Sequence, residues 1–177
     1  IFNNNKIVIA SQNKGKVKEI KIMLKPLKIE VLSAVEFNLK EPIEDGLSFE
    51  KNALIKSSYV CKNTGIPSLS DDSGICFCDI NNEPGVYSAR WAGESKNFNL
   101  AMSKINEAIK KVEKPSYDCF FVCALSLSWP NGDNVTVSGK INGKFSWPPK
   151  GNTGFGYDPI FKHMGYDENF DEMDPKF

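Results

Sequence analysis

The sequence is short of histidine and of long apolar runs, and each shortage excludes a class of protein. His163 is the only histidine. A cluster of histidine metal ligands is therefore excluded, and no serine stands in a nucleophile-elbow motif that would pair with His163. No stretch approaches the roughly 18 consecutive apolar residues that predict a transmembrane helix. We expect neither a triad hydrolase nor a membrane-spanning protein, and no membrane partner.

An excess of charge of one sign is also missing. The 177 residues include 22 Lys and Arg and 22 Asp and Glu, so the formal net charge is zero. A strongly basic nucleic-acid binder is excluded as the default interpretation, although a local basic pocket for a small anion is not. The hydrophobic content of 41% suffices for a packed core, and we expect a single domain over residues 1–177. No signal peptide is recognised at the start. Because the first residue is Ile1 and not Met, we expect the chain to be truncated at this end.

The cysteines are too few and too scattered for a disulfide framework or a metal site. There are five, an odd number, and the sequence contains no two Cys-x-x-Cys pairs and no histidine cluster. In a chain able to form its own core, this pattern predicts reduced thiols and a cytoplasmic protein. We expect buried thiols at these positions, which are Cys61, Cys76, Cys78, Cys119 and Cys123.

Strand and helix patterns alternate along the chain. A polar turn is predicted at Asp71-Asp72-Ser73-Gly74, and Asn131-Gly132 is a hairpin signal late in the sequence. Period-two patterns indicate the strands, and spacings of three and four indicate the helices. The predicted strands cover residues 6–10, 75–80, 117–127 and 135–141, and the predicted helices cover 17–24, a segment capped by Ser48, and 98–112. This order predicts an α/β protein with a mixed sheet.

The turn between the first strand and the first helix has the composition of an anion site. Ser11, Asn13 and Lys16 lie where the backbone N–H groups of a helix start attract anions, and the lysine adds a full positive charge. The spacing is not that of a P-loop. A plain capped helix with solvated lysines explains the same residues, so this turn alone leaves both interpretations open.

Carboxylates gather in two further places. Glu44 stands in an acidic stretch before Gly46, and Asp71 and Asp72 are adjacent. Mg²⁺ prefers carboxylate oxygens, needs only one or two of them, and shares the phosphates of a substrate. A carboxylate beside the metal can also accept a proton from an attacking water. The alternative is a pair of solvated acidic turns.

A glycine-rich segment with aromatic residues lies near the end of the chain. In residues 151–161, glycines let the backbone approach a flat ligand, and Phe155 and Tyr157 offer rings to stack on it. The alternative is a glycine-rich hairpin loop. The segment by itself does not decide between a ligand site and a turn.

Five motifs follow one another along almost the whole chain. In order, they are Ser11-x-Asn13-x-x-Lys16; Glu44-x-Gly46-x-Ser48-Phe49-x-x-Asn52-Ala53-x-x-Lys56; Asp71-Asp72-Ser73-Gly74; Pro84-Gly85-Val86-Tyr87-Ser88-Ala89-Arg90; and Phe155-Gly156-Tyr157-Asp158-Pro159. Together they resemble the inosine triphosphate pyrophosphatase family, and the ordered set is far more specific than any one motif. The resemblance implies an elongated mixed β-sheet flanked by helices in two lobes around a central cleft, and a homodimer.

The resemblance also implies a reaction and a site. Members of the family cleanse the nucleotide pool: with Mg²⁺ they hydrolyse ITP, dITP and XTP to the monophosphate and pyrophosphate. Carried over by motif, Glu44 and Asp72 hold Mg²⁺, and Asp72 activates water. The resemblance also implies that the triphosphate is bound by Ser11, Asn13, Lys16 and Lys56, and that Ser73 contacts the substrate. For the base, it implies stacking by Phe155 and a pocket lined by Gly156, Tyr157 and Asp158. Asp71 and Asn52 are implied to support the site.

One segment of the family pattern is missing. In the family, the stretch that resembles residues 165–175 runs on to a lysine and a Ser-His-Arg motif that reads the purine edge, whereas this chain stops at Phe177. We therefore expect truncation at this end too, and discrimination against ATP and GTP has weaker support. Two alternatives stay open. One is a pyrophosphatase of the same fold for pyrimidine or modified nucleotides, and the other is a non-catalytic nucleotide-binding protein.

Overall fold

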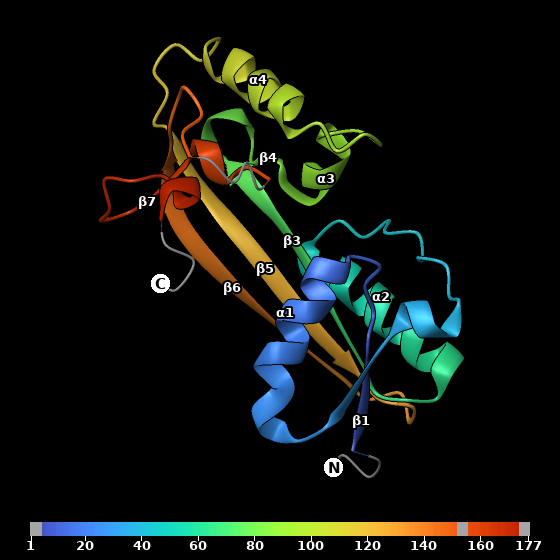
Figure 1. Cartoon of the computed structure of the whole chain (residues 1–177). Coiled ribbons are helices and arrows are strands. Elements are labelled where there is room, and N and C mark those ends of the chain that lie inside the picture. The colour runs from blue at the N-terminus through green and yellow to red at the C-terminus, as the bar shows by residue number, and fades with distance from the viewer. Residues whose placement is uncertain (1–4, 152–155, 174–177) are drawn as a thin grey trace. The chain divides into compact units, whose positions relative to one another are not determined.

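A seven-stranded sheet runs through the computed structural model, which describes residues 5–151 and 156–173 (Figure 1). Its strands are β1 (Lys6–Ile9), β2 (Glu30–Ser33), β3 (Ser68–Phe77), β4 (Glu83–Pro84), β5 (Asp118–Ser128), β6 (Asn134–Phe145) and β7 (Phe161–His163). The helices are α1 (Lys14–Leu24), α2 (Phe49–Thr64), α3 (Ser88–Trp91) and α4 (Phe98–Ile109). Short 3-10 helices cover Lys25–Leu27, Ala34–Phe37, Cys78–Ile80, Gly85–Tyr87, Asp158–Ile160 and Phe170–Glu172.

The sheet is mixed. Its strand order is β2-β1-β3-β5-β6-β7, and β4 pairs with β3 beside this path. β1 is parallel to both β2 and β3, whereas β3 and β4, like β6 and β7, are antiparallel. The predicted mixed α/β fold is confirmed. None of the helices within the described ranges is long and apolar enough to cross a membrane.

The chain divides into two compact units. Unit 1 comprises Ile1–Asp72 and Cys123–Ser138, and unit 2 comprises Ser73–Val122 and Gly139–Phe177. Strands β3, β5 and β6 each pass from one unit into the other. Each unit therefore takes its residues from separate parts of the sequence, and each has its own buried cluster.

Unit 1 is built on β1, α1, β2 and α2. The side chain of Asn13 caps α1 and the hydroxyl of Ser48 caps α2, as the sequence predicts. α2 ends at Gly65, whose φ of 68° lies in the left-handed region that favours glycine. Val60 of α2 packs in one buried cluster with Val8 of β1. This packing fixes the helix against the strand.

Hydroxyl groups add a second attachment between α2 and β5. Ser57 Oγ lies 3.0 Å from Ser126 Oγ and 2.8 Å from Ser128 Oγ. All three serines are buried, so these bonds satisfy polar groups that water does not reach. They fix α2 at the turn that follows Lys56, a residue of the candidate site described below.

Unit 2 has the larger buried cluster. The helical stripe predicted over residues 98–112 is α4, and its buried residues include Met102, Ile105 and Ile109. They pack in one cluster with Phe77 and Phe161. The helix ends at Ile109, three residues before the predicted end, so Val112 lies in the turn that follows.

The polar turn predicted at Asp71-Asp72-Ser73-Gly74 is wrong. These residues lie inside β3, which continues to Phe77 and gives way to the 3-10 helix Cys78–Ile80. The turn preference of Asp and Gly is local and weak. β3 lies between β1 and β5 in the sheet, and its place in the sheet overrides that preference.

The prediction that all five thiols are buried is also wrong in part. Cys61, Cys76 and Cys119 are buried, whereas Cys78 and Cys123 are exposed. Cys78 falls within the predicted strand 75–80, but β3 ends at Phe77 and Cys78 lies in the 3-10 helix that follows. Cys123 is exposed on β5 next to the buried Ala124, as expected for successive residues of a strand. All five are free thiols, as predicted.

Candidate active site

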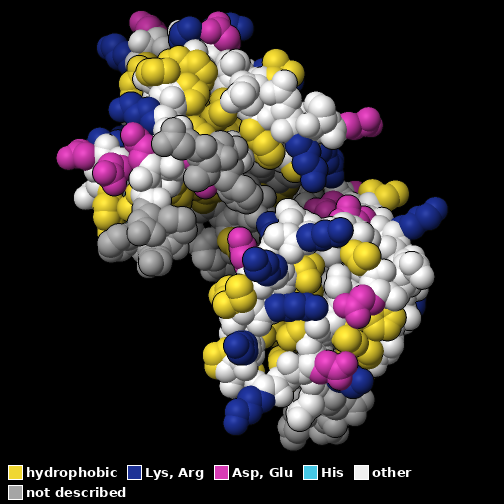
Figure 2. Space-filling model, viewed as in Figure 1, with side chains coloured by type: hydrophobic (Ala, Val, Ile, Leu, Met, Phe, Trp, Pro, Cys, Tyr) yellow, Lys and Arg dark blue, Asp and Glu magenta, His cyan; other side chains and the backbone are white. Residues whose placement is uncertain are grey.

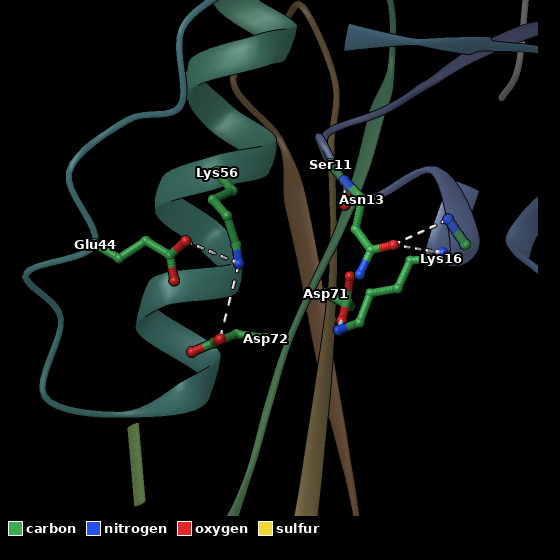
Figure 3. Close-up of polar contacts among 8 residues, drawn as sticks. Ser11, Asn13, Lys16, Glu44, Lys56, Asp71 and Asp72 are labelled. Carbon is green, nitrogen blue, oxygen red and sulfur yellow. Dashed lines mark hydrogen bonds and ion pairs between the residues drawn. The ribbon is translucent and has the colours of Figure 1, made fainter. Parts of the chain in front are cut away.

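The turn from β1 into α1 is shaped by its own side chains. Asn13 Oδ1 accepts hydrogen bonds from the backbone N–H groups of Gly15 at 2.9 Å and Lys16 at 3.4 Å (Figure 3). The backbone N–H of Asn13 donates to Ser11 Oγ at 3.1 Å. These bonds hold the N-terminal end of α1 and the backbone of Lys16 in one conformation. The positive end of the helix and the lysine suit an anion.

Lys16 and Asp71 form the first ion pair of unit 1. Lys16 Nζ donates to Asp71 Oδ2 (Figure 3). The Asp71 side chain is largely buried, whereas about a third of the Lys16 side chain is exposed. The buried carboxylate thus holds an ammonium group that remains accessible to a larger anion.

Lys56 lies between two carboxylates. Its Nζ is 3.2 Å from Glu44 Oε1 and 3.7 Å from Asp72 Oδ1 (Figure 3). The side chains of Lys56 and Asp72 are only 14% and 13% exposed. Two carboxylates against one ammonium leave a partly buried group with an excess of negative charge, and such a group is suited to a further cation.

Asp71 and Asp72 are neighbours in sequence but have different partners. Successive side chains of a strand point to opposite faces. Asp71 accordingly points toward Lys16 and Asp72 toward Lys56 (Figure 3). The pleat separates the two like charges and gives each its own lysine, which explains why an acidic pair is tolerated inside β3.

Burial raises the pKa of the Asp72 carboxyl above its ordinary value. The Lys56 ammonium opposes this rise in pKa, and the negative charge of Glu44 adds to it. A hydrogen bond from the Asn52 side chain lowers the pKa. The net upward direction makes Asp72 a stronger base than a solvated aspartate, which is the property required of a proton acceptor.

Asn52 links the two carboxylate-bearing segments. Its Oδ1 accepts from the Gly46 backbone N–H at 2.8 Å, and its side chain also hydrogen-bonds Asp72. A Cβ added to Gly46 would lie 2.6 Å from Asn52 Oδ1, so only glycine permits this approach. Asn52 is 1% exposed. It connects the loop that carries Glu44 to α2 and β3.

The predicted base-pocket residues lie in unit 2. Tyr157 is buried; its hydroxyl donates to the Ser88 carbonyl oxygen at 2.7 Å, and burial raises its pKa. Burial, together with the charge of Asp171, raises the pKa of Asp158 to about 6. Gly156 has a φ of 55°, a value that favours glycine. Phe155 lies outside the described residues.

The predicted site residues divide between the two units, and the contacts above join Lys16 to Asp71 and Lys56 to Glu44 and Asp72 within unit 1. The unit 1 group is Ser11, Asn13, Lys16, Glu44, Asn52, Lys56, Asp71 and Asp72, and the unit 2 group is Ser73, Gly156, Tyr157 and Asp158. Ser73 follows Asp72 directly in β3. Sequence reasoning assigned no role to Ser88, although it stands in one of the five motifs. Besides accepting from Tyr157, it accepts from the Ile75 N–H through Oγ at 3.0 Å.

The carboxylates of unit 1 fit a magnesium ion. Among residues 5–151 and 156–173, no group of three or more His, Cys, Asp or Glu side chains could hold a metal. Mg²⁺ needs no such group, because it is commonly bound by one or two carboxylates with water and substrate phosphates. Glu44 and Asp72 both lie within 4 Å of the same ammonium nitrogen, so they already converge on one cation.

A basic surface accompanies this group in unit 1. Figure 2 shows Lys and Arg side chains in a row on the face where α1 lies in Figure 1. Exposed lysines recur along α1 and just after it, at Lys14, Lys18, Lys21 and Lys25. Their positive charge favours the approach of a polyanion to the α1 region.

The fold and the unit 1 cluster define a mixed α/β protein whose charged residues suit a phosphorylated ligand and a divalent cation. Comparison with known proteins gives the family. Residues 7–177 match the model of the Ham1 family, and the chain belongs to this family. The membership predicted from the sequence, in a family of nucleotide pyrophosphatase enzymes, is confirmed.

Relatives and solved structures agree with this assignment. A dITP/XTP pyrophosphatase from Zymomonas mobilis is 46% identical over 95% of this chain and 81% of its own length, and one from Rhizobium meliloti is 43% identical over 94% and 81%. A HAM1 protein structure from Coxiella burnetii has a TM-score of 0.91 and 34% identity, covering 97% of this chain and 88% of that one. A dITP/XTP pyrophosphatase structure from Mycobacterium abscessus has a TM-score of 0.85 and 35% identity, covering 97% and 90%.

Proposed function

We propose that this chain hydrolyses purine nucleoside triphosphates with altered bases, namely ITP, dITP and XTP, to the monophosphate and pyrophosphate. The convergence of Lys56, Glu44 and Asp72 carries the proposal, because it combines a cation for phosphate with two carboxylates for a metal and a base. The names of the Zymomonas mobilis and Rhizobium meliloti relatives support the substrate class. On this proposal the chain removes such nucleotides from the pool.

Asp72 acts as the base. It takes a proton from a water molecule, the water oxygen forms a bond to the α phosphorus, and the bond from that phosphorus to the bridging oxygen breaks. Pyrophosphate leaves with the electron pair of that bond. The raised pKa and the low exposure of Asp72 support this role.

The lysines bind the triphosphate. Lys16 and Lys56 offset charge that grows on the leaving pyrophosphate, and Ser11 and Asn13 hold the turn that presents Lys16. Asp71 orients Lys16 through their ion pair. Asn52 positions Asp72 and, through Gly46, the loop of Glu44.

Glu44 and Asp72 would hold Mg²⁺, which when bound would supply neutralisation of phosphate charge and a lower pKa of water. The two carboxylates, at 3.2 and 3.7 Å from one ammonium nitrogen, support this assignment. Release of Lys56 toward a phosphate would leave both carboxylates available to the metal.

Residues of unit 2 bind the base. Phe155 stacks on it, Gly156, Tyr157 and Asp158 line its pocket, and Ser73 contacts the substrate near the metal. The hydrogen bond between Tyr157 and Ser88 supports a rigid pocket, since it fixes the ring beside the glycine. We extend the proposal to a single catalytic domain over residues 1–177 that forms a homodimer.

A cytoplasmic location completes the proposal. The five free thiols support it, because a reducing compartment preserves them. A nucleotide-pool substrate is found in the same compartment.

Phosphate release from ITP and ATP with Mg²⁺ tests the function. Each nucleotide is incubated with and without added inorganic pyrophosphatase. We expect phosphate from ITP only when the helper enzyme is present, because the direct product is pyrophosphate. Phosphate without the helper would mean cleavage at the γ phosphate, and faster turnover of dTTP or UTP than of ITP would mean a pyrimidine enzyme.

A further inference from the structure

A pocket lies wholly within unit 2 and shares no residue with the candidate active site. It has a volume of about 640 Å³ and is formed by the end of α4, the turn after it, and the ends of β5 and β6. We call it the aromatic pocket and define it by six of its lining residues: Asn106, Lys110, Tyr117, Phe145, Ser146 and Trp147.

Three of these residues form a ladder of stacked rings. The rings of Tyr117 and Phe145 are 6.3 Å apart at an angle of 18°, and those of Phe145 and Trp147 are 6.3 Å apart at 25°. The two end residues remain 46% and 41% exposed. Exposed rings held in parallel form a surface on which another flat ring can stack.

The backbone holds the ladder in place. Tyr117 has a φ of 59°, an unusual value for an aromatic residue. Its N–H donates to Asp79 Oδ2 at 2.7 Å, and its carbonyl oxygen accepts from the Phe145 N–H at 2.7 Å. The platform is therefore preorganised, which reduces the entropy lost when a ligand binds.

Asn106, near the end of α4, adds a side-chain amide to the lining of the pocket. Its backbone carbonyl oxygen accepts from the Lys110 N–H at 3.0 Å, so the residue is held in the last turn of the helix. A side-chain amide in a pocket lining is matched by a ligand that offers one acceptor and one donor side by side.

We propose that the aromatic pocket binds the base of a purine nucleotide. Asparagine pairs with adjacent donor and acceptor groups on a purine edge, as it does with the N6 and N7 atoms of adenine. The base stacks on the ring ladder, a contact that tolerates different bases. The exposed ion pair between Lys110 and Glu107, at 2.9 Å, is weak enough for a ligand phosphate to replace the carboxylate.

Adenine and hypoxanthine both present a neighbouring donor and acceptor, so two sources of the ligand share this chemistry. AMP would make the pocket a sensor of adenine nucleotides, and IMP would make it a second site for a product of the proposed reaction. The proposal needs no catalysis by unit 1, and binding at this pocket is measured without turnover.

Calorimetric titration of the whole chain with AMP and, separately, with IMP tests the proposal. The variants are Asn106→Leu, which keeps the shape but removes the amide, and Trp147→Ala, which removes one end of the ladder. Tyr166→Ala is the matched control, because Tyr166 is a similarly exposed aromatic residue of unit 2 outside the pocket. Lys56→Ala reports on any binding at the candidate active site.

We expect saturable binding of AMP or IMP that Trp147→Ala weakens about fivefold or more, as expected for loss of a stacking contact. Asn106→Leu weakens binding by at least a similar factor, and Tyr166→Ala and Lys56→Ala leave it unchanged. Thermal unfolding of each variant verifies that it is folded. Three results overturn the proposal. They are no binding of either nucleotide at millimolar concentration, binding lost in Lys56→Ala but kept in Asn106→Leu, and conversion of a dimer to a monomer by Trp147→Ala, which would show that a second copy covers the rings.

Discussion

The two units place their candidate functional residues in opposite environments. In unit 1 the carboxylates of Glu44, Asp71 and Asp72 each face a lysine ammonium. In unit 2 the predicted residues include a buried tyrosine paired with a backbone carbonyl, and Asp158, whose pKa burial raises to about 6. Ion pairs suit the polyanionic part of a nucleotide, whereas low polarity suits its flat base. On the proposed function, unit 1 carries the chemistry and unit 2 the choice of base.

The largest effect is expected in unit 1, from Asp72→Asn. The amide cannot accept the proton of water, so kcat for ITP falls about 10²- to 10⁴-fold, the range that a general base contributes. Binding of ITP without turnover stays measurable by calorimetry. Asp133→Asn, at an exposed position of the same unit, is the matched control and keeps the parent rate. Equal turnover in Asp72→Asn and the parent would rule out Asp72 as the base.

Lys56→Ala is the next largest change. We expect kcat/KM for ITP to fall about 10- to 100-fold, with KM raised and kcat lowered, because a charged contact to phosphate strengthens as the leaving group gains charge. Lys62→Ala, at an exposed position of the same helix, is the control. An unchanged kcat/KM would remove Lys56 from the site.

Asn52→Ala tests the positioning of the two carboxylate segments. It leaves the partly buried N–H of Gly46 without its acceptor, so we expect the free energy of unfolding to fall by about 1–3 kcal/mol. Urea denaturation measures this loss. Asn63→Ala removes an exposed side chain from the end of the same helix and should have a much smaller effect. Equal effects of the two changes would show that the bond to Gly46 adds nothing.

The smallest expected effect is a pH-dependent change in stability in unit 2, from Asp158→Asn. Since the pKa of Asp158 in the folded chain, about 6, lies above its unfolded value of about 3.9, the protonated form stabilises the fold at low pH. This stability is lost as the pH rises through 6. The Asp158→Asn side chain cannot ionise, so at pH 8 we expect the free energy of unfolding of this variant to be about 1 kcal/mol higher than that of the parent. This value is already reduced for the partial exposure of the side chain. At pH 4 we expect little difference between the two proteins.

Asp167→Asn, at an exposed position of unit 2, is the control for this pH dependence. Urea denaturation of both variants and the parent at pH 4 and pH 8 provides the comparison. If Asp158→Asn is no more stable than the parent at pH 8, ionised Asp158 is not penalised by burial.

The fold was largely predictable because its signals are local. Ser48 and Asn13 are the predicted caps, and the apolar stripe of α4 is the predicted buried face. The predicted turn at Asp71–Gly74 failed because incorporation of β3 into the sheet is a tertiary effect that local propensity does not reveal. The same strand explains how adjacent aspartates reach different lysines, which spacing alone does not predict.

The site could be predicted as a set of residues but not as an arrangement. The motifs named Lys56 and Asp72, and only the folded chain shows that they are 3.7 Å apart and mostly buried. Asn52 and Gly46 stand in the same motif, six residues apart. Their hydrogen bond depends on the close approach of the Gly46 backbone to the Asn52 side chain, which the motif alone does not reveal. The aromatic pocket had no sequence signal, because Asn106 of α4, Tyr117 before β5 and Trp147 after β6 are separate in the sequence and meet only in the folded chain.

The most direct test of the comparison is the ratio of kcat/KM for ITP to kcat/KM for ATP in three proteins. The parent is compared with Lys56→Ala from unit 1 and Asp158→Asn from unit 2, at pH 8 with Mg²⁺. We predict that Lys56→Ala lowers both values by the same factor and leaves the ratio unchanged, whereas Asp158→Asn changes the ratio. An altered ratio in Lys56→Ala together with a parental ratio in Asp158→Asn would contradict the assignment of chemistry to unit 1 and base choice to unit 2.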